Sequence, residues 1–377
     1  MKYRGLSVAL LISLLIVSLL LYHDLSTKEP SENKPPDAFV GIDVAYADLA
    51  EIKRLVEEIC SYTNLFVIGS TGITRNATKL DEACQYIYDK GLSFIVYIER
   101  SPGSQWLEDA KNRWGDRFLG FYAFDEVGGK QLDLYEYRPV WEADNYADAA
   151  SQFFSAINGT LNYMTRDYNS SVYFPLFTSD YALYWFDYKA GYDVLLAQFG
   201  WNYSRQLNVA LCRGAATVQN KDWGVIIAWT YNHPPYIESG EELYNDMVLA
   251  YKNGAKYVAV FDSDKNYTQG ILEEEHFEAL RQFWQYAQDN PRTSVTVNDR
   301  VAYVLPKDYA YGFRGPNDKI WGLWEADAFS DELCVSLNSL MEQYGTKLDI
   351  IYDDGLELNN AYGYSKLIFW NGTVYVP

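Results

Sequence analysis

FLGFYAFDEVGG, residues 118–129, is a run of seven largely apolar residues that ends in two adjacent carboxylates and two glycines. Apolar runs of this length, rich in aromatic residues and closed by polar residues and glycine, are typical of buried β-strands. We therefore predict a strand over residues 118–126, with Asp125 and Glu126 at its carboxyl end.

Seven further runs of this kind alternate with helical patterns, which is the signature of a βα chain. The eight predicted strands cover residues 38–46, 63–70, 92–99, 118–126, 171–180, 192–201, 223–231 and 255–263. Eight strands in a chain of this length predict an α/β fold of the (β/α)8 TIM barrel type, and a doubly wound open sheet is the alternative. The long segment 127–170, between the fourth and fifth strands, is expected to build one wall of a cleft.

The pattern changes near Pro291, so we predict a barrel over residues 37–290 and a small C-terminal α/β accessory domain over 291–377. In the second domain, residues 297–308 read as a strand. Residues 329–345 read as a helix with Ser330 as its N-cap and Gly345 as its C-cap. No glycine-rich nucleotide-binding motif occurs there.

The N-terminus carries Lys2 and Arg4, followed by an uncharged apolar stretch over residues 6–22. This predicts a cytoplasmic stub and an N-terminal transmembrane signal anchor over residues 1–25, a polar linker over 26–36, and an extracytoplasmic remainder. A cleaved signal peptide, and hence a secreted protein, is the alternative. Six glycosylation sequons agree with that side of the membrane. They begin at Asn76, Asn158, Asn169, Asn202, Asn266 and Asn371.

The composition of the chain limits which molecules and ions the protein is expected to bind. The net charge of −20 disfavours nucleic acid as the main partner, because phosphate backbones would be repelled. Only His23, His233 and His276 occur, and no CxxC motif, so we predict neither a metal site nor a cofactor. Cys60 and Cys84 lie on consecutive predicted helices and could pair if the protein is external. The sequence does not indicate an oligomeric state.

In a barrel, catalytic groups lie at the carboxyl ends of the strands. Carboxylates, aromatic residues and a few other polar residues gather at the predicted strand ends. The candidates are Asp43, Glu99, Asp125, Glu126, Asp180, Gln198, Trp201, Trp229, Tyr231, His233 and Asp262. If the fourth strand continues through both carboxylates, alternation along it predicts that only one of Asp125 and Glu126 faces the barrel axis. Asp262 and Asp264 would fit a capped turn better than a Ca²⁺ site.

A carboxylate pair that closes the fourth strand after a glycine-aromatic run resembles (β/α)8 glycoside hydrolases. In many of these enzymes the fourth strand ends in the glutamic acid that protonates the leaving oxygen. The resemblance implies an oligosaccharide or polysaccharide substrate, with Glu126 as the general acid. The chain departs from the best-known patterns, because it lacks their Asn-Glu pair, the chitinase Asp-x-Asp-x-Glu run and a glutamate closing the seventh strand.

Glycosyl hydrolysis needs a second carboxyl group. The catalytic candidates besides Glu126 are Asp125, Glu99 and Asp262. The expected substrate-binding residues are Asp43, Asp180, Gln198, Trp201, Trp229, Tyr231 and His233. The 34 Tyr and 11 Trp residues suit a groove for sugars. A non-catalytic carbohydrate-binding or cell-surface protein on the same barrel is the main alternative, and the missing seventh-strand glutamate favours it. A carboxylate-based lyase is a third, disfavoured by the scarcity of basic residues at the strand ends.

Overall fold

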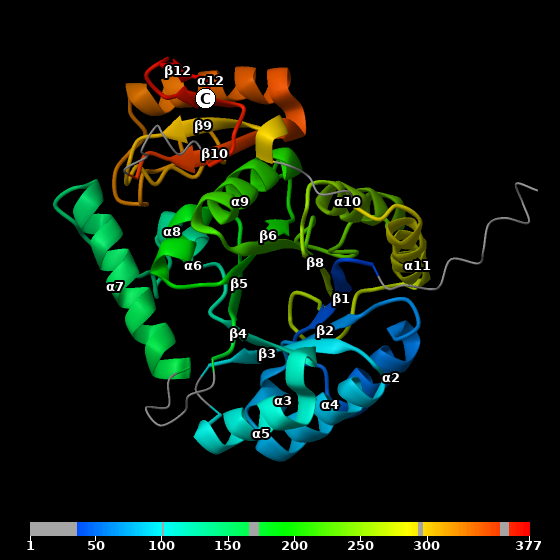
Figure 1. The fold of residues 1–377 in the computed structure, drawn as a ribbon. Helices are drawn as coiled ribbons and strands as arrows, with labels where there is room; N and C mark the ends of the chain where they lie inside the picture. The colour runs from blue at the N-terminus through cyan, green and yellow to red at the C-terminus, as the bar shows by residue number, and fades with distance from the viewer. Residues whose placement is uncertain (1–35, 100–101, 166–172, 293–296, 355–361) are drawn as a thin grey trace, which may run out of the picture. The chain divides into compact units, whose positions relative to one another are not determined.

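The computed structural model describes residues 36–99, 102–165, 173–292, 297–354 and 362–377. Its centre is a closed barrel of eight parallel strands, which confirms the predicted barrel and excludes the open sheet. The strands follow one another in chain order, and pairing of β1 with β8 closes the barrel (Figure 1). They are β1 (Phe39–Val44), β2 (Leu65–Ile68), β3 (Ser93–Ile98), β4 (Phe118–Ala123), β5 (Leu176–Asp180), β6 (Val194–Phe199), β7 (Asp222–Ile227) and β8 (Tyr257–Phe261).

Side chains alternate between two apolar clusters along these strands. Val67 and Leu196 belong to the cluster inside the barrel. Phe66 and Leu195, each one residue away, belong to the larger cluster between the strands and the surrounding helices. Both faces of each strand are therefore buried, which explains why the strands read as continuous apolar runs.

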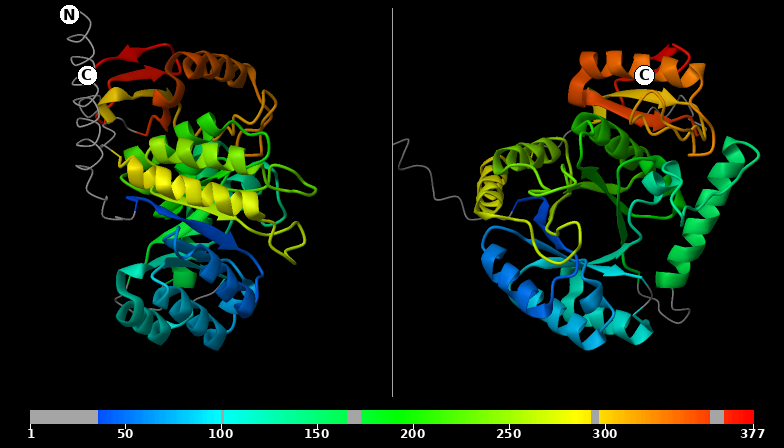
Figure 2. Two further views of the ribbon diagram at one scale, coloured as in Figure 1. Left: turned by 90° about the vertical axis from the view of Figure 1, so that its right-hand side faces the viewer. Right: turned by 180° about the vertical axis from the view of Figure 1, so that it is seen from behind.

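Helices surround the barrel (Figure 2). In the first of these helices, α2 (Leu49–Ile59), four apolar side chains at helical spacing, from Ile52 to Ile59, are buried against the strands. Asp48 caps the N-terminus of this helix. The helices of the barrel are α2 (Leu49–Ile59), α3 (Thr71–Thr74), α4 (Ala77–Asp89), α5 (Ser104–Trp114), α6 (Val127–Leu132), α7 (Tyr146–Thr165), α8 (Tyr184–Ala190), α9 (Arg205–Gln219), α10 (Gly240–Lys252) and α11 (Glu274–Asp289). The predicted long excursion after the fourth strand contains α6 and α7.

In its described residues, the C-terminal part forms a four-stranded sheet in the order β10-β9-β11-β12, with one α-helix. The strands are β9 (Val301–Leu305), β10 (Leu348–Tyr352), β11 (Lys366–Phe369) and β12 (Val374–Tyr375), and the helix is α12 (Ala328–Tyr344). The Ser330 N-cap prediction is wrong. Asp327 is the N-cap, accepting from the backbone N–H of Ser330, while the Ser330 hydroxyl completes the capping box as its third residue. Gly345 follows the helix as predicted.

The sheet packs on α9 of the barrel, and residues Asp37–Pro377 form one compact unit. Asp349 on β10 is fully buried and accepts hydrogen bonds from Arg213 on α9 (2.7 Å), Arg300 (2.6 Å) and Tyr364 (2.8 Å). A Cβ atom on Gly214 would lie 2.4 Å from the carbonyl oxygen of Ile350, so only glycine permits this approach of helix and strand.

The predicted anchor and most of the linker, residues 1–35, lie outside the described residues, as does Asn169. In the part of the chain that the structure describes, no helix is long and apolar enough to cross a membrane. Cys60, Cys84, Cys212 and Cys334 are all free thiols, so Cys60 and Cys84 do not pair in this structure.

Candidate active site

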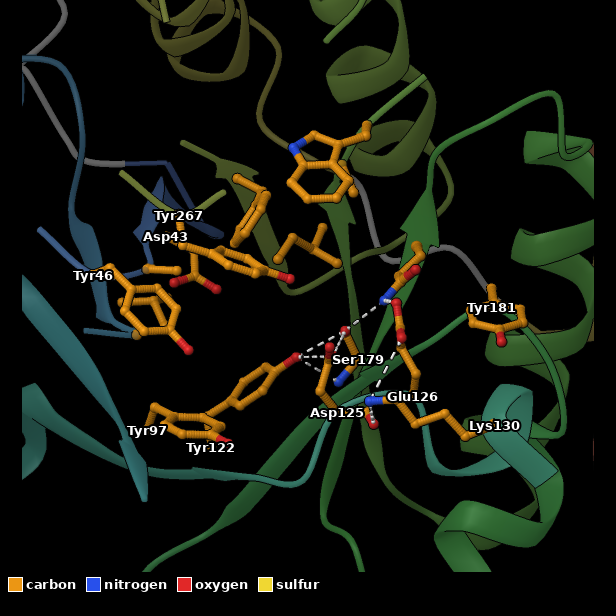
Figure 3. A pocket seen from close by; sticks show the side chains of 18 of the residues that line it. Asp43, Tyr46, Tyr97, Tyr122, Asp125, Glu126, Lys130, Ser179, Tyr181 and Tyr267 are labelled. Atoms are coloured by element: carbon orange, nitrogen blue, oxygen red, sulfur yellow. Dashed lines mark hydrogen bonds and ion pairs between the residues drawn. The ribbon is translucent and has the colours of Figure 1, made fainter. Parts of the chain in front are cut away.

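The carboxyl ends of the barrel strands surround a cleft of about 620 Å³ (Figure 3). All eight strands contribute to its lining. The lining residues within the strands are Asp43, Val67, Tyr97, Tyr122, Ser179, Gln198, Ile226 and Phe261, in order from β1 to β8. The cleft therefore lies where barrel enzymes carry their catalytic groups.

The two carboxylates that end the predicted fourth strand both line this cleft, so the prediction that only one faces the axis is wrong. β4 ends at Ala123, and the chain then turns through left-handed backbone at Phe124 (φ 51°) and Glu126 (φ 58°). The Thr178 hydroxyl donates to the carbonyl oxygen of Phe124, and the Glu126 N–H donates to that of Ser179 (2.9 Å). Strand alternation thus stops before the carboxylates, and β5 fixes the turn.

Asp180 lies at the end of β5 but outside the cleft lining. Its buried carboxylate accepts the backbone N–H groups of Gly128 (2.6 Å) and Gly129 (2.9 Å) at the start of α6. It also accepts those of Tyr181 and Ala182. A carboxylate at these unpaired N–H groups fixes the start of the helix. Asp180 thus positions the turn that carries Glu126.

Asp125 takes part in a hydrogen-bond network with β4 and β5. Its Oδ1 accepts from the Tyr122 hydroxyl (2.7 Å) and from the Ser179 hydroxyl (2.7 Å). Gln198 donates in turn to the Ser179 oxygen (3.0 Å), and the Ser179 N–H donates to the Tyr122 oxygen (3.2 Å). Two hydroxyl donors on one carboxylate oxygen suit an ionised group that accepts charge-assisted hydrogen bonds.

Glu126 lies beside Asp125 and is partly exposed to the cleft. Its Oε1 accepts from Gln198 (2.8 Å), and its Oε2 lies 3.6 Å from the Nζ of Lys130. Desolvation and the negative charge of Asp125 raise the pKa of Glu126 to about 7, outweighing the lowering effects of Lys130 and Gln198. A substantial fraction of Glu126 is therefore protonated near neutral pH.

Asp43, from β1, lines the cleft together with Asp125 and Glu126 (Figure 3). Burial and the charge of Asp125 raise the pKa of Asp43 to about 8. Its buried Oδ1 has no hydrogen-bond partner among the residues that the structure describes. Asp43 is therefore a largely neutral carboxyl group near neutral pH, and one of its oxygens is buried without a hydrogen-bond partner.

Aromatic rings form another side of the cleft. Tyr46 and Tyr267 are partly exposed, and their ring centroids lie 4.9 Å apart. The Trp229 ring lies 6.0 Å from Tyr267 and 6.5 Å from Trp201. Tyr46, Tyr267 and Trp201 all have left-handed backbone, which is uncommon for bulky residues and concentrates at binding sites. Figure 3 shows Tyr46 and Tyr267 on the side of Asp43, across from Asp125 and Glu126.

The other predicted site residues are placed as follows. Glu99 lines the cleft but pairs with Arg75. Asp262 lies outside the main cleft and accepts the N–H groups of Ile271 (2.6 Å) and Leu272 (3.0 Å). Tyr231 and His233 are exposed and do not line the cleft. The structure therefore brings together seven of the eleven predicted residues. These are Asp43, Glu99, Asp125, Glu126, Gln198, Trp201 and Trp229.

Asp264 accepts the N–H groups of Asn266 and Thr268, which agrees with a capped turn. In the described part of the chain, no group of three or more His, Cys, Asp or Glu side chains is arranged to hold a metal ion.

Several lining residues were not among the predicted site residues, notably Tyr97, Lys130, Asp133, Ser179 and Tyr267. Lys130 lies one helical turn after Glu126, so recognising α6 would have placed it beside the acid. Ser179 directly precedes Asp180 at the end of β5, and this position at a strand end is the signal that could have found it. Tyr267 lies in a loop after β8, where the sequence carries no periodic signal.

No family model matches the sequence, and no curated protein matches it significantly. Among solved structures, the fold is similar to a polyextremophilic β-galactosidase from the Antarctic haloarchaeon Halorubrum lacusprofundi, with a TM-score of 0.52 and 10% identity, covering 88% of this chain and 68% of that one. It is also similar to α-L-fucosidase isoenzyme 2 from Paenibacillus thiaminolyticus, with a TM-score of 0.51 and 11% identity, covering 88% and 59%. At these identities the likeness shows the fold alone. The chain is a (β/α)8 barrel with a small C-terminal sheet domain, similar in fold to barrel-type glycoside hydrolases.

Proposed function

We propose that this protein is a glycoside hydrolase that cleaves a glycan by carboxylate general acid/base chemistry. The observation that carries the proposal is the pair Asp125 and Glu126 in one aromatic cleft, with Glu126 titrating near neutrality. Glycoside hydrolysis requires one protonated and one ionised carboxyl group at the scissile bond. The similar fold of a β-galactosidase and an α-L-fucosidase supports the same class.

Glu126 is the proposed general acid, because a carboxyl group with a pKa of about 7 holds a transferable proton at neutral pH. It would protonate the glycosidic oxygen as the bond to the sugar breaks. Asp125 is the proposed second carboxylate, acting as the nucleophile or as the base that activates water. The hydroxyl groups of Tyr122 and Ser179 hold it in place.

The rest of the cleft suits a sugar ring. The rings of Tyr46, Tyr267 and Trp229 offer apolar faces against which the C–H face of a sugar packs. The neutral carboxyl of Asp43 and the amide of Gln198 can hydrogen-bond sugar hydroxyl groups. The aromatic and carboxylate sides together would orient the scissile bond toward Glu126.

A non-catalytic carbohydrate-binding protein is the second candidate. The observation that favours it is the end of the seventh strand, which brings Ile226, Ala228 and Trp229 to the cleft and no carboxylate. On this alternative the same aromatic cleft binds a glycan without cleaving it.

The test uses the part of the protein from residue 37 onward and its Glu126→Gln variant. It measures how each binds a panel of glycans and how fast each releases reducing ends from them. We expect turnover by the wild type and a loss of at least about 100-fold in Glu126→Gln. Glu99→Gln is the control, because Glu99 lines the cleft but pairs with Arg75, and it should keep activity within about threefold. Undiminished turnover in Glu126→Gln would remove Glu126 from its role. Binding without turnover by the wild type would favour the second candidate.

We also propose that the barrel works on the extracytoplasmic side. The sequence features at residues 1–36 support this location, and so does the surface position of the sequons. All five sequon asparagines in the described ranges are exposed. Mass spectrometry of the protein from its own source should find sugar on them, and unmodified asparagines at every sequon would count against the location.

A further inference from the structure

The short helix α6, which begins directly after Glu126, is supported at its other end by the C-terminal domain. Gln131 in its last turn is fully buried, and its side-chain amide donates to the carbonyl oxygen of Trp321 (2.9 Å) and to that of Val140 (3.0 Å). Trp321 is itself fully buried and packs on Phe153 of α7. The last turn of α6 is therefore hydrogen-bonded to the C-terminal domain.

Gly322 brings that domain into direct backbone contact with α6. It has left-handed backbone (φ 70°), and a Cβ atom there would lie 2.3 Å from the carbonyl oxygen of Gln131 and 3.0 Å from that of Leu132. No larger residue could take this place without displacing the helix. A helix of six residues has little stability of its own, so these contacts matter for where it lies.

Arg314 continues the contact to the wall of the cleft. Its guanidinium binds Asp318 through Nε (3.0 Å) and Nη2 (2.7 Å), and its Nη1 binds Asp133 (2.7 Å). Asp133 ends α6 and lines the cleft. The side chains of Arg314 and Asp318 are only 16% and 6% exposed, so this pair is largely shielded from solvent, whereas the side chain of Asp133 is 48% exposed.

Tyr181 completes this wall. Its hydroxyl donates to Asp133 (2.5 Å), and the Arg314 guanidinium lies 5.6 Å from its ring centroid. The ring also lies on α6, since a Cβ atom on Gly129 would be 2.1 Å from its Cζ. Tyr203 stacks on Tyr181 at 5.9 Å. Arg314 thus contacts two lining residues, Asp133 and Tyr181, from outside the barrel.

We propose that residues 309–324 of the C-terminal domain are part of the active-site scaffold, and that Arg314 is a positioning residue that holds α6 and the wall formed by Asp133 and Tyr181. Asp180 fixes the start of α6, and Gln131, Gly322 and Arg314 fix its end. Glu126 immediately precedes this helix, so its position depends on both. The effect on catalysis rests on the proposed function, whereas the effect on α6 does not.

The experiment measures hydrogen exchange and catalysis in Arg314→Met. We expect faster amide exchange over residues 127–135, with exchange in β1 and α2 unchanged. We also expect kcat to fall by about 10- to 100-fold with a smaller change in KM, since a shift of about 1 Å in a catalytic group has effects of this size. Arg314→Lys should restore part of both losses, because one ammonium can serve one of the two carboxylates.

Arg281→Met is the matched control. Arg281 on α11 forms ion pairs with Glu58 of α2 and with Glu274 and Glu278 of its own helix, and it does not line the cleft. It should leave exchange over 127–135 and kcat unchanged. If Arg314→Met fails to fold, Asp318→Asn tests the same bridge by removing the bidentate partner of Arg314.

Wild-type exchange over residues 127–135 in both bridge variants would overturn the proposal. Uniformly faster exchange across the barrel would also overturn it, because it would show general destabilisation rather than positioning. If the wild type cleaves no glycan but exchange over 127–135 still rises selectively, the scaffold role stands and the proposed hydrolase function falls.

Discussion

Gln198 and Glu126 are joined by a hydrogen bond of 2.8 Å, in which the side-chain amide of Gln198 donates to Oε1 of Glu126. Gln198 lies on β6 and Glu126 follows β4, so this bond crosses over β5. The same nitrogen donates to Ser179 on β5 (3.0 Å), which in turn donates to Asp125 (2.7 Å). A donor to a carboxylate stabilises its ionised form, so Gln198 opposes the rise in pKa that burial and Asp125 impose on Glu126.

Gln198→Leu should therefore raise the pKa of Glu126. If protonated Glu126 is the acid, activity falls as pH rises through its pKa of about 7, so the basic limb of the pH profile should move to higher pH. We expect a shift of about one pH unit, the size of one hydrogen bond to a charged group. The pH dependence of kcat/KM measures it. Gln282→Leu, on the exposed face of α11, should leave the limb in place. A limb that stays put or moves to lower pH in Gln198→Leu would contradict the assignment.

Asp125→Asn should lower the pKa values of its neighbours, whereas Gln198→Leu raises that of Glu126. The charge of Asp125 raises the pKa of both Glu126 and Asp43, so removing it should lower both values. Because the variant also lacks the proposed second carboxylate, activity should fall at least about 100-fold. Carbon-13 NMR titration of the carboxyl groups measures the pKa values without turnover. If neither carboxyl titrates at lower pH in the variant, Asp125 does not couple to them.

Tyr267→Ala tests the aromatic side of the cleft. The Tyr267 ring packs against Tyr46 at a tilt of 39° and lies beside Trp229, without a hydrogen bond to the carboxylate network. Loss of one ring face should raise KM, or the Kd of a bound oligosaccharide, about 3- to 10-fold with little change in kcat. Tyr137→Ala is the control, because Tyr137 is 81% exposed and does not line the cleft. Equal effects of the two substitutions would mean that Tyr267 is an ordinary surface ring.

The barrel could be predicted because its evidence is local. Strands buried on both faces read as continuous apolar runs, and eight of them alternate with helical patterns. The end of β4 could not be predicted. The 118–126 run looks uniform, but Thr178 and Ser179 on another strand bind the chain at Phe124 and Glu126. Those contacts end the strand at Ala123 and turn both carboxylates into the cleft.

The site residues that were predicted differ from those that were not in the same way: the first have a local signal in the sequence, and the second depend on contacts with distant parts of the chain. Asp43 lies at the end of β1, and Asp125 and Glu126 follow the end of β4. Strand ends converge in a barrel, so sequence position was enough to predict these three. Asp180 also closes a strand, but it accepts the N–H groups of Gly128 and Gly129, an interaction between the end of β5 and the start of α6. The pairing of Tyr46 with Tyr267 joins the loops after the first and last strands, and only closure of the barrel brings them together.

The raised pKa of Asp43 predicts how the free energy of unfolding depends on pH. Its pKa is about 8 in the folded protein and 3.8 in a solvated chain, so the folded state binds a proton that the unfolded state releases. The stabilising contribution of this proton is complete below pH 4 and is lost as pH rises toward 8. Over that range the free energy of unfolding should fall by an amount on the order of 3–5 kcal/mol through this group.

Asp43→Asn, which is always neutral, should therefore be more stable than the wild type at pH 8–9 and should lose this part of the pH dependence. Urea unfolding from pH 4 to 9 measures both, with the exposed Asp116→Asn as the control that should match the wild type. A wild-type slope in Asp43→Asn would show that Asp43 is ionised in the folded cleft, which would also remove its proposed role as a neutral hydrogen-bond donor to the sugar.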